Sequence, residues 1–126
     1  MSGLSGLATF SGFSVDDLAS AKAFYVDTLG LTVADETEHF FGLKLPEQTV
    51  LVYAKGGAHA PATYTVLNFQ TPDVEGVVDD LTARGVEFLR YDGAGQDEKG
   101  IAREMGPTIA WFADPAGNVF SVIEPD

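Results

Sequence analysis

The chain has 126 residues, 45% of them hydrophobic, which is enough for one domain with a core of its own. Nineteen acidic and seven basic side chains give a formal net charge of -12, which argues against binding to nucleic acid or to anionic membranes. The absence of cysteine removes disulfides, thiolate metal sites and cysteine nucleophiles. No apolar run approaches the roughly 20 residues that span a bilayer, and MSGLSGLATF lacks the features of a signal peptide, so we expect a cytoplasmic protein.

The first predicted helix lies within residues 13–31, FSVDDLASAKAFYVDTLGL. Asp16 or Asp17 can cap its first turn, and Gly30 can close its last. Its apolar stripe repeats at helical spacing: Leu18, Ala21, Tyr25 and Leu29.

A second helix of the same design is predicted within residues 69–88, FQTPDVEGVVDDLTARGVEF. Thr71 precedes a proline suited to the first helical position, and Gly85 closes the helix. Placing Asp17 on Asp73 and Gly30 on Gly85 gives a repeat of about 55 residues. The apolar stripe here is Val74, Val77, Val78 and Leu81.

The strands repeat as well. Residues 45–52 can be laid on residues 114–121, each a turn that leads into an apolar strand, and residues 39–44 and 108–113 form the strands before these turns. Each half therefore reads strand, helix and three strands. We predict one α+β domain over residues 1–126, made of two βαβββ modules (about 5–56 and 62–125), with helices on the convex face of a curved mixed sheet that surrounds a cleft.

Two segments carry a resemblance to a known family. DLASAKAFYVDTLGLTV and IAWFADPAGNVFSVIEP resemble the first-module and closing signatures of the vicinal oxygen chelate superfamily. This superfamily includes glyoxalase I, extradiol dioxygenases, fosfomycin-resistance enzymes and bleomycin-resistance binding proteins. The resemblance covers nearly the whole chain and implies the fold, but the fold hosts many functions.

The resemblance also implies where a divalent metal would be held. In metal-dependent relatives, His, Glu or Gln side chains on the outer strands of each module point into the cleft. The matching positions are Phe10, Val66 and Ser121, with Val52 as the counterpart of Ser121 in the first module. Residues 7–15, 63–71 and 119–123 contain no His, Asp, Glu or Cys. We therefore predict no metal site and no cofactor, because about three such donors must converge to hold an ion.

Ser121 stands where the family would place a glutamate, and it has two interpretations. Its hydroxyl can hydrogen-bond a ligand, or it can be a packed serine satisfied by the protein itself. Trp111 is predicted to form a flat wall of the pocket, since strand alternation places it on the cleft face. Phe10, Tyr64 and Asn68 are expected on the same face of the first strands, so the pocket is aromatic with few polar groups.

The remaining candidates lie in loops. Residues 91–107 form a long glycine-rich and charged segment, typical of a lid or a mobile loop, in which Arg103 either contacts an anionic group of the ligand or pairs with a nearby acid. His39 is interpreted as part of a charged hairpin edge and His59 as a solvated histidine in the linker between modules.

The sequence thus favours a metal-free protein that binds a small aromatic or largely apolar molecule and forms a homodimer. We assign ligand contacts to Phe10, Tyr64, Val66, Asn68, Arg103, Trp111 and Ser121, and no catalytic residue. The alternative is a glyoxalase-like or dioxygenase-like lyase or isomerase that uses a metal at another place or acid-base groups of the loop, such as Asp97, Glu98 or Glu104. Whether one chain or a dimer builds the cleft stays open.

Overall fold

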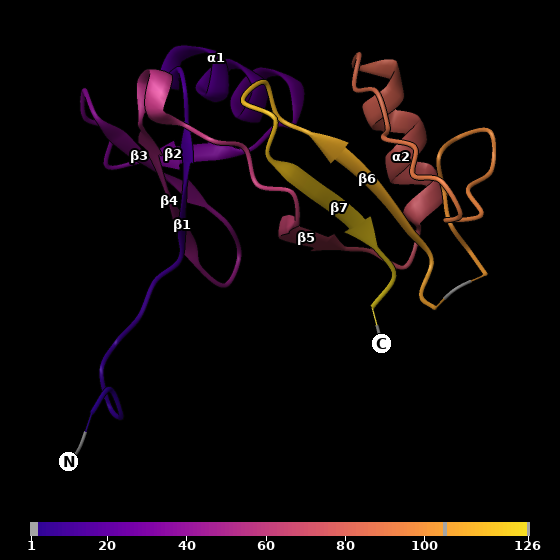
Figure 1. Ribbon diagram of the computed structural model, residues 1–126, viewed down its shortest axis with the longest axis horizontal. Coiled ribbons are helices and arrows are strands. Elements are labelled where there is room, and N and C mark those ends of the chain that lie inside the picture. The colour runs from indigo at the N-terminus through magenta and orange to yellow at the C-terminus, as the bar shows by residue number, and fades with distance from the viewer. Residues whose placement is uncertain (1–2, 105, 126) are drawn as a thin grey trace.

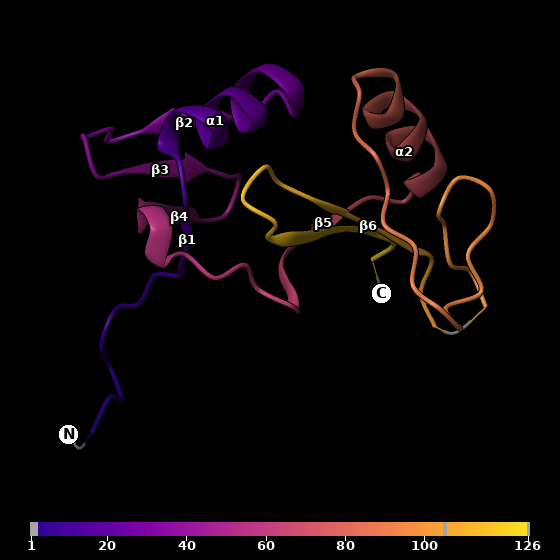
Figure 2. The ribbon, with the colours of Figure 1, turned by 45° about the horizontal axis from the view of Figure 1, so that its top comes forward.

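The computed structural model describes residues 3–104 and 106–125. Two small sheets lie side by side, and α1 and α2 lie on the same side of them (Figures 1 and 2). Among the described residues, no helix combines the length and hydropathy that crossing a bilayer requires. The elements are β1 (Gly12–Val15), α1 (Leu18–Ala23), the π-helical segment η1 (Phe24–Thr28), β2 (Thr32–Ala34), β3 (Phe40–Lys44), β4 (Thr49–Ala54), the 3-10 turn η2 (Gly56–Ala58), β5 (Thr65–Gln70), α2 (Val74–Ala83), β6 (Ile109–Ala113) and β7 (Val119–Ile123).

Each sheet belongs to one predicted module. The first has the strand order β1-β4-β3-β2 and the second β5-β7-β6, and in each sheet the first strand runs parallel to its neighbour while the other pairs are antiparallel. In the second module the strand after the helix is reduced to one bridge, Phe88 with Phe112. The α+β fold of two βαβββ modules is confirmed, with its mixed sheet divided into two hydrogen-bonded parts.

The first helix begins as predicted. Asp17 is the N-cap, and its carboxylate accepts a hydrogen bond from the Ala19 N–H at 3.0 Å. After α1 the coil widens into the π-helical segment η1, in which the Leu29 N–H donates to the carbonyl of Phe24. The segment stops before Gly30, whose φ of +75° is readily available to glycine alone.

The second helix begins two residues later than the sequence predicted. The Thr71 hydroxyl accepts the Asp73 N–H, and the Asp73 carboxylate in turn accepts the Gly76 N–H at 3.0 Å. Asp73 is therefore the N-cap and Pro72 lies outside the helix, because the threonine hydroxyl closes a local turn ahead of it. Gly85, with a φ of +97°, follows the helix end as expected.

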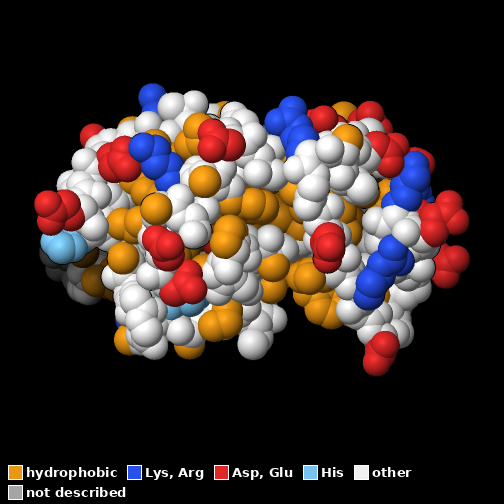
Figure 3. Space-filling view, turned by 90° about the horizontal axis from the view of Figure 1, so that it is seen from above, with side chains coloured by type: hydrophobic (Ala, Val, Ile, Leu, Met, Phe, Trp, Pro, Cys, Tyr) orange, Lys and Arg blue, Asp and Glu red, His pale blue; other side chains and the backbone are white. Residues whose placement is uncertain are grey.

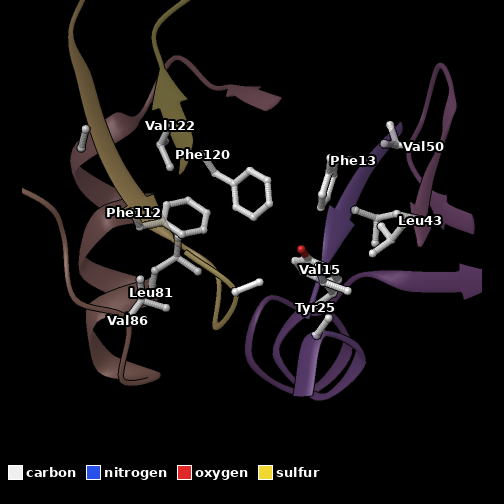
Figure 4. Packing of buried hydrophobic residues seen from close by; sticks show 14 of the residues in the cluster. Phe13, Val15, Tyr25, Leu43, Val50, Leu81, Val86, Phe112, Phe120 and Val122 are labelled. Atoms are coloured by element: carbon white, nitrogen blue, oxygen red, sulfur yellow. The ribbon is translucent and has the colours of Figure 1, made fainter. Parts of the chain in front are cut away.

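One core runs through both modules. The buried side chains of the strands face the helices and meet between the two sheets (Figure 4). The rings of Phe13 in β1 and Phe120 in β7 are 5.7 Å apart with an edge-on arrangement, and the Tyr25 ring lies 5.9 Å from Phe120. From above, hydrophobic side chains are visible between the two halves (Figure 3), where a small hollow of about 120 Å³ is lined by Leu29, Leu31, Phe69, Val77, Leu81, Phe112 and Val122.

The internal repeat has a different register from the one that the sequence suggested. Val52 is fully buried in the core, whereas Ser121 pairs with Asn68 and shares the opposite face of its sheet with it. The turn between β3 and β4, residues 45–48, is one residue shorter than the turn between β6 and β7, residues 114–118. Val52 was therefore the wrong counterpart of Ser121. Leu51, which pairs with Gly12 on the face away from the helices, takes that place.

Candidate functional site

We call the side of each sheet that faces away from the helices its open face. On the open face of the second sheet, β7 places Ser121 directly opposite Trp111 of β6 and Asn68 of β5. Side chains of paired residues project to the same face, so three of the predicted site residues are neighbours. Sequence alternation alone was enough to group them.

Ser121 is fully buried, and its hydroxyl donates a hydrogen bond to Oδ1 of Asn68 at 2.5 Å. This bond uses the only proton of the hydroxyl, so Ser121 can offer a ligand only its lone pairs. The amide group of Asn68 remains a donor, and Asn68 is exposed. Asn68 is thus the exposed member of the pair, and it lines a separate hollow of about 360 Å³ together with residues 45–48, 67, 69 and 70.

Trp111 is half-buried, and Tyr91 packs against it edge-on, with ring centroids 5.2 Å apart and planes at 82°. The two rings fix each other's orientation. Beside Trp111 lies a hollow of about 360 Å³, and Asp92 is the one ionisable residue among the described residues that line it. Its other lining residues are Gly93, Ala94, Ala102, Pro107, Ile109 and Trp111. Most of the wall of this hollow is therefore apolar.

The loop that forms one side of this hollow, within residues 91–107, is held by hydrogen bonds from side chains to nearby backbone carbonyls. Gln96 donates from Nε2 to the carbonyls of Leu89 and Gly100, and Arg90 donates to the carbonyls of Asp97 and Glu98. In this part of residues 91–107, which the sequence predicts to be a lid or a mobile loop, side chains thus satisfy four backbone carbonyls.

Ion pairs between side chains connect the same loop to α2. Lys99 pairs with Glu75 at 2.7 Å and Asp79 at 3.0 Å, and Arg103 pairs with Glu75 and Asp97, both at 3.3 Å. The hydrogen bond from Lys99 is the main cause that holds the pKa of Glu75 below its ordinary value, and the two carboxylates raise the pKa of Lys99. Of the two interpretations of Arg103, the structure shows the ion pair with nearby acids.

Asp97 is the central carboxylate of the loop. Burial pushes its pKa upward, but the N–H groups of Ile101 and Lys99, together with Arg103, outweigh burial, and the pKa of Asp97 is lowered. A carboxylate held in this way is a weak general base, because its neighbours already stabilise the charged form.

The other predicted contacts lie elsewhere. Tyr64 precedes β5, and Val66 lies at the irregularity where the pairing of β5 with β7 shifts. Both line a hollow of about 350 Å³ between the linker and the open face of β1 and β4, together with Gly12, Ser14 and Tyr53. Phe10 precedes β1, and 76% of its surface is exposed. Within one chain, the predicted site residues therefore do not share a single cavity.

His59 has a role that the sequence interpretation missed. Its Nε2 donates to the carbonyl of Ala116 at 3.0 Å, and its Nδ1 lies 2.8 Å from the Ser14 hydroxyl. The prediction of a solvated loop histidine was wrong, since this half-buried ring joins the linker to β1 and to the β6–β7 turn. Its alanine and glycine neighbours gave no signal of such contacts.

The signature residues meet in a buried network between the modules. The Tyr25 hydroxyl donates to Asp114 at 2.5 Å, and the Asn118 side chain donates to the carbonyl of Ser14 at 2.8 Å. Asp114 also accepts the Asn118 N–H. Burial first, and the Asp114 carboxylate second, raise the pKa of Tyr25. The motif therefore joins the two modules, and Asn118 also lines the hollow that Tyr64 and Val66 share.

The residues at the family's metal positions do not fit a metal ion. Phe10 and Val66 carry only hydrocarbon, and the buried hydroxyl of Ser121 is bonded to Asn68. Across residues 3–104 and 106–125, no group of three or more His, Cys, Asp or Glu side chains is placed to hold an ion.

Among solved structures, several relatives share this fold. An antibiotic-binding protein, TnmS3 of Streptomyces sp. CB03234, is 24% identical, with a TM-score of 0.67 over 96% of this chain and 98% of that one. A superfamily member from Sphaerobacter thermophilus is 25% identical, with a TM-score of 0.67 over 94% and 98% of the chains. A lactoylglutathione lyase from Agrobacterium tumefaciens is 23% identical, with a TM-score of 0.59 over 94% and 93%.

A search of curated proteins finds no match. The family model of the Glyoxalase/Bleomycin resistance protein/Dioxygenase superfamily matches residues 7–122. That span includes both βαβββ modules, the Tyr25–Asp114 connection and the open-face cluster, so the chain belongs to this superfamily.

Proposed function

We propose that this protein binds a small aromatic or largely apolar molecule without a metal ion. The observation that carries the proposal is the open face of the second sheet, where Trp111, braced by Tyr91, borders a mostly apolar hollow beside the Ser121–Asn68 pair. The aromatic wall provides stacking area. Asn68 lies on the same open face, across Ser121 from Trp111, and offers an amide group to a guest that extends beyond this hollow.

The chemistry of the metal positions supports binding over metal-dependent catalysis. Phe10, Val66 and Ser121 supply no imidazole and no carboxylate. The antibiotic-binding relative shows that the fold is used for binding, and the lactoylglutathione lyase shows that it is also used for catalysis. At identities below 25% these relatives support the fold alone, so the choice rests on the side chains of this chain.

The proposal includes a homodimer that works in the cytoplasm. Among the described residues of one chain, the edges are open at β1 and β2 in the first sheet and at β5 in the second, whereas bridges from Phe88 and Ala102 cover part of the outer edge of β6. A symmetric partner is the usual way in which such edges and faces are covered. Among the described residues, Tyr64 and Val66 line one hollow and Trp111 lines another, which supports a site that uses two chains.

Titration with 2-naphthol, a neutral aromatic probe, tests the proposal. Trp111 is the only tryptophan, so its fluorescence reports on this site directly. We expect saturable quenching by the dialysed protein and no stoichiometric Mn, Fe, Ni or Zn in elemental analysis. One equivalent of such a metal, removed by a chelator together with an enzymatic activity, would overturn the proposal.

A further inference from the structure

Ser14 and His59 form a side-chain pair that the binding function does not use. The Ser14 hydroxyl lies 2.8 Å from Nδ1 of His59, although the two residues are 45 positions apart in the chain. Nε2 of the same ring lies 3.0 Å from the carbonyl of Ala116. Because a carbonyl oxygen only accepts, the proton of the neutral ring is assigned to Nε2, and Nδ1 carries a lone pair. The Ser14 hydroxyl is therefore the donor, and Nδ1 is placed to take its proton.

This arrangement has the three parts that nucleophilic catalysis by a serine requires. A hydroxyl is hydrogen-bonded to a base, and a third group orients the base from its far side. Here the third group is the backbone carbonyl of Ala116, in the position that a carboxylate often occupies.

The start of the linker brings His59 beside β1. The Lys55 N–H donates to the carbonyl of Val15 at 2.9 Å, so the chain leaves β4 against the end of β1. The 3-10 turn η2 follows, and the His59 N–H closes it on the carbonyl of Gly56 at 3.1 Å. The imidazole is thus held by a turn and by both of its ring nitrogens.

The β6–β7 turn holds the orienting carbonyl and the backbone of the serine. Ala116 is buried in this turn, and the Gly117 N–H donates to the carbonyl of Asp114 at 2.9 Å. The Asn118 side chain reaches from the same turn to the carbonyl of Ser14 at 2.8 Å. One rigid turn therefore positions both members of the pair.

The backbone N–H of Ser14 is directed toward the place where negative charge develops in acyl transfer. β4 and the residue after it donate to the carbonyls of Ser11 and Val15, both at 2.9 Å, whereas the carbonyl of Ser14 faces the other way and accepts from Asn118. The N–H and C=O of one strand residue point to the same side, so the Ser14 N–H also points away from β4. A backbone N–H at the nucleophile is a typical donor to an oxyanion.

Ser14 lines the hollow of about 350 Å³ between the linker and the first sheet. Among the described residues that line it, none is Asp, Glu, Lys, Arg or His, although the chain carries a net charge of -12. Tyr53 and Tyr64, 38% and 70% exposed, provide aromatic walls. These uncharged walls favour an uncharged molecule with an aromatic or short apolar group.

We propose that Ser14 and His59 hydrolyse small uncharged carboxylic esters. Oγ of Ser14 attacks the ester carbonyl carbon, and Nδ1 of His59 takes the hydroxyl proton and gives it to the leaving alcohol as the C–O bond breaks. A water molecule then attacks the acyl-serine and gives a proton to Nδ1, and this proton returns to Oγ as the carboxylic acid leaves. Water is the only co-reactant. The activity does not rest on the binding function at Trp111.

Hydrolysis of p-nitrophenyl butyrate tests the pair. Ser14→Ala and His59→Gln remove the nucleophile and the base, and Ser11→Ala and His39→Gln are matched controls at a neighbouring serine and at the only other histidine. We expect steady turnover by the wild type, a fall of about a hundredfold or more in the first two variants, and no change in the controls. Absence of turnover in the wild type, or turnover that survives in Ser14→Ala, would overturn the proposal.

Covalent labelling of the wild type separates chemistry from a structural role of His59, since His59→Gln also loosens the linker. Diisopropyl fluorophosphate phosphorylates an activated serine with loss of fluoride. We expect one adduct per chain, located at Ser14 by mass spectrometry of peptides and absent when the protein is first unfolded in urea. A protein that forms no adduct, or forms it at another residue, would show that His59 does not activate Ser14.

Discussion

At the scale of single residues, the two most informative side chains have opposite roles. Tyr25 donates a hydrogen bond to a buried carboxylate and connects the modules, while Trp111 is half-buried on the open face of the second sheet. Both come from aromatic-rich signature segments, and only the structure shows that one lies in the connection between the modules and the other on the open face.

We predict that Tyr25→Phe lowers the free energy of unfolding by about 1 to 3 kcal/mol, because Asp114 loses its hydroxyl donor in a buried place. The folded state raises the pKa of Tyr25, so its contribution is complete below its ordinary pKa of 10 and declines as the pH rises above 10. Urea denaturation between about pH 8 and about pH 11 measures this. The variant should lose less stability over this range than the wild type, and Tyr64→Phe, an exposed control, should behave like the wild type.

We predict that Trp111→Ala weakens the binding of 2-naphthol by about 1 to 3 kcal/mol, which is roughly ten- to hundredfold, because the stacking wall is lost. Ser121→Ala should cost about 1 kcal/mol or less, since its hydroxyl already bonds to Asn68. Isothermal titration calorimetry with both variants decides the order. A larger effect at Ser121 would show that the serine, and not the tryptophan, anchors the guest.

At the scale of elements, the β6–β7 turn and the loop before β6 are both positioned by contacts to distant parts of the chain. The turn is held against β1 through Asn118, and the loop against α2 through Lys99 and Arg103. The glycines of the turn and of the loop permit several backbone conformations, and these contacts select one of them.

We predict that Gly117→Ala is more destabilising than Gly93→Ala. Both glycines have positive φ angles, +87° and +79°, and an L side chain costs about 1 kcal/mol there. At Gly117 a Cβ atom would also lie 3.0 Å from Cβ of Pro61, whereas Gly93 faces open space. Thermal unfolding should show about 2 kcal/mol or more for the first variant and about 1 for the second. Equal losses of stability in the two variants would show that the linker around Pro61 can move aside for the added Cβ atom without cost.

We predict that Lys99→Gln loosens the loop without unfolding the protein, because the pairs it removes are exposed. Hydrogen exchange of the amides in residues 92–104 should accelerate several-fold, while Lys44→Gln on β3 should leave it unchanged. Acid should act in the same way. The pKa of Glu75 is lowered in the folded state, so its contribution is present above its ordinary value of 4.5 and disappears as the pH falls below it. Exchange that is insensitive to both changes would show that Gln96 and Arg90 hold the loop alone.

At the scale of the whole molecule, the main feature of a single chain is that the open faces of its sheets and several strand edges are not covered by other parts of the chain. We predict a homodimer in solution at micromolar concentration, since a second copy can cover the exposed Leu4 and Leu7 and the exposed aromatic side chains. Sedimentation should show one species with twice the 13.4 kDa mass of the chain. A single species at the mass of one chain would contradict this.

Much of the fold could be predicted from the sequence, because helical periodicity, caps and turn residues act locally. The Asp17 cap, the two closing glycines and the shared face of Ser121 and Trp111 all follow from spacing of a few residues. The wrong register at Val52 arose because two turns of similar appearance differ by one residue, and a strand reverses its faces with a shift of one. The contacts of His59 join segments 45 and 57 residues apart, which no local pattern records.

The connection between Tyr25 and Asp114 has a consequence for biosynthesis. The two residues are separated by 89 positions, and Asn118 reaches back still further to Ser14. While the ribosome makes the first module, the hydroxyl of Tyr25 has no carboxylate to accept its hydrogen bond. The Tyr25 ring also lacks its neighbour Phe120. Contacts of such long sequence separation form late and slow the search for the native state. We expect the nascent first module to stay incompletely ordered until residues 114–120 have left the exit tunnel, so this interval is when the chain depends most on chaperones.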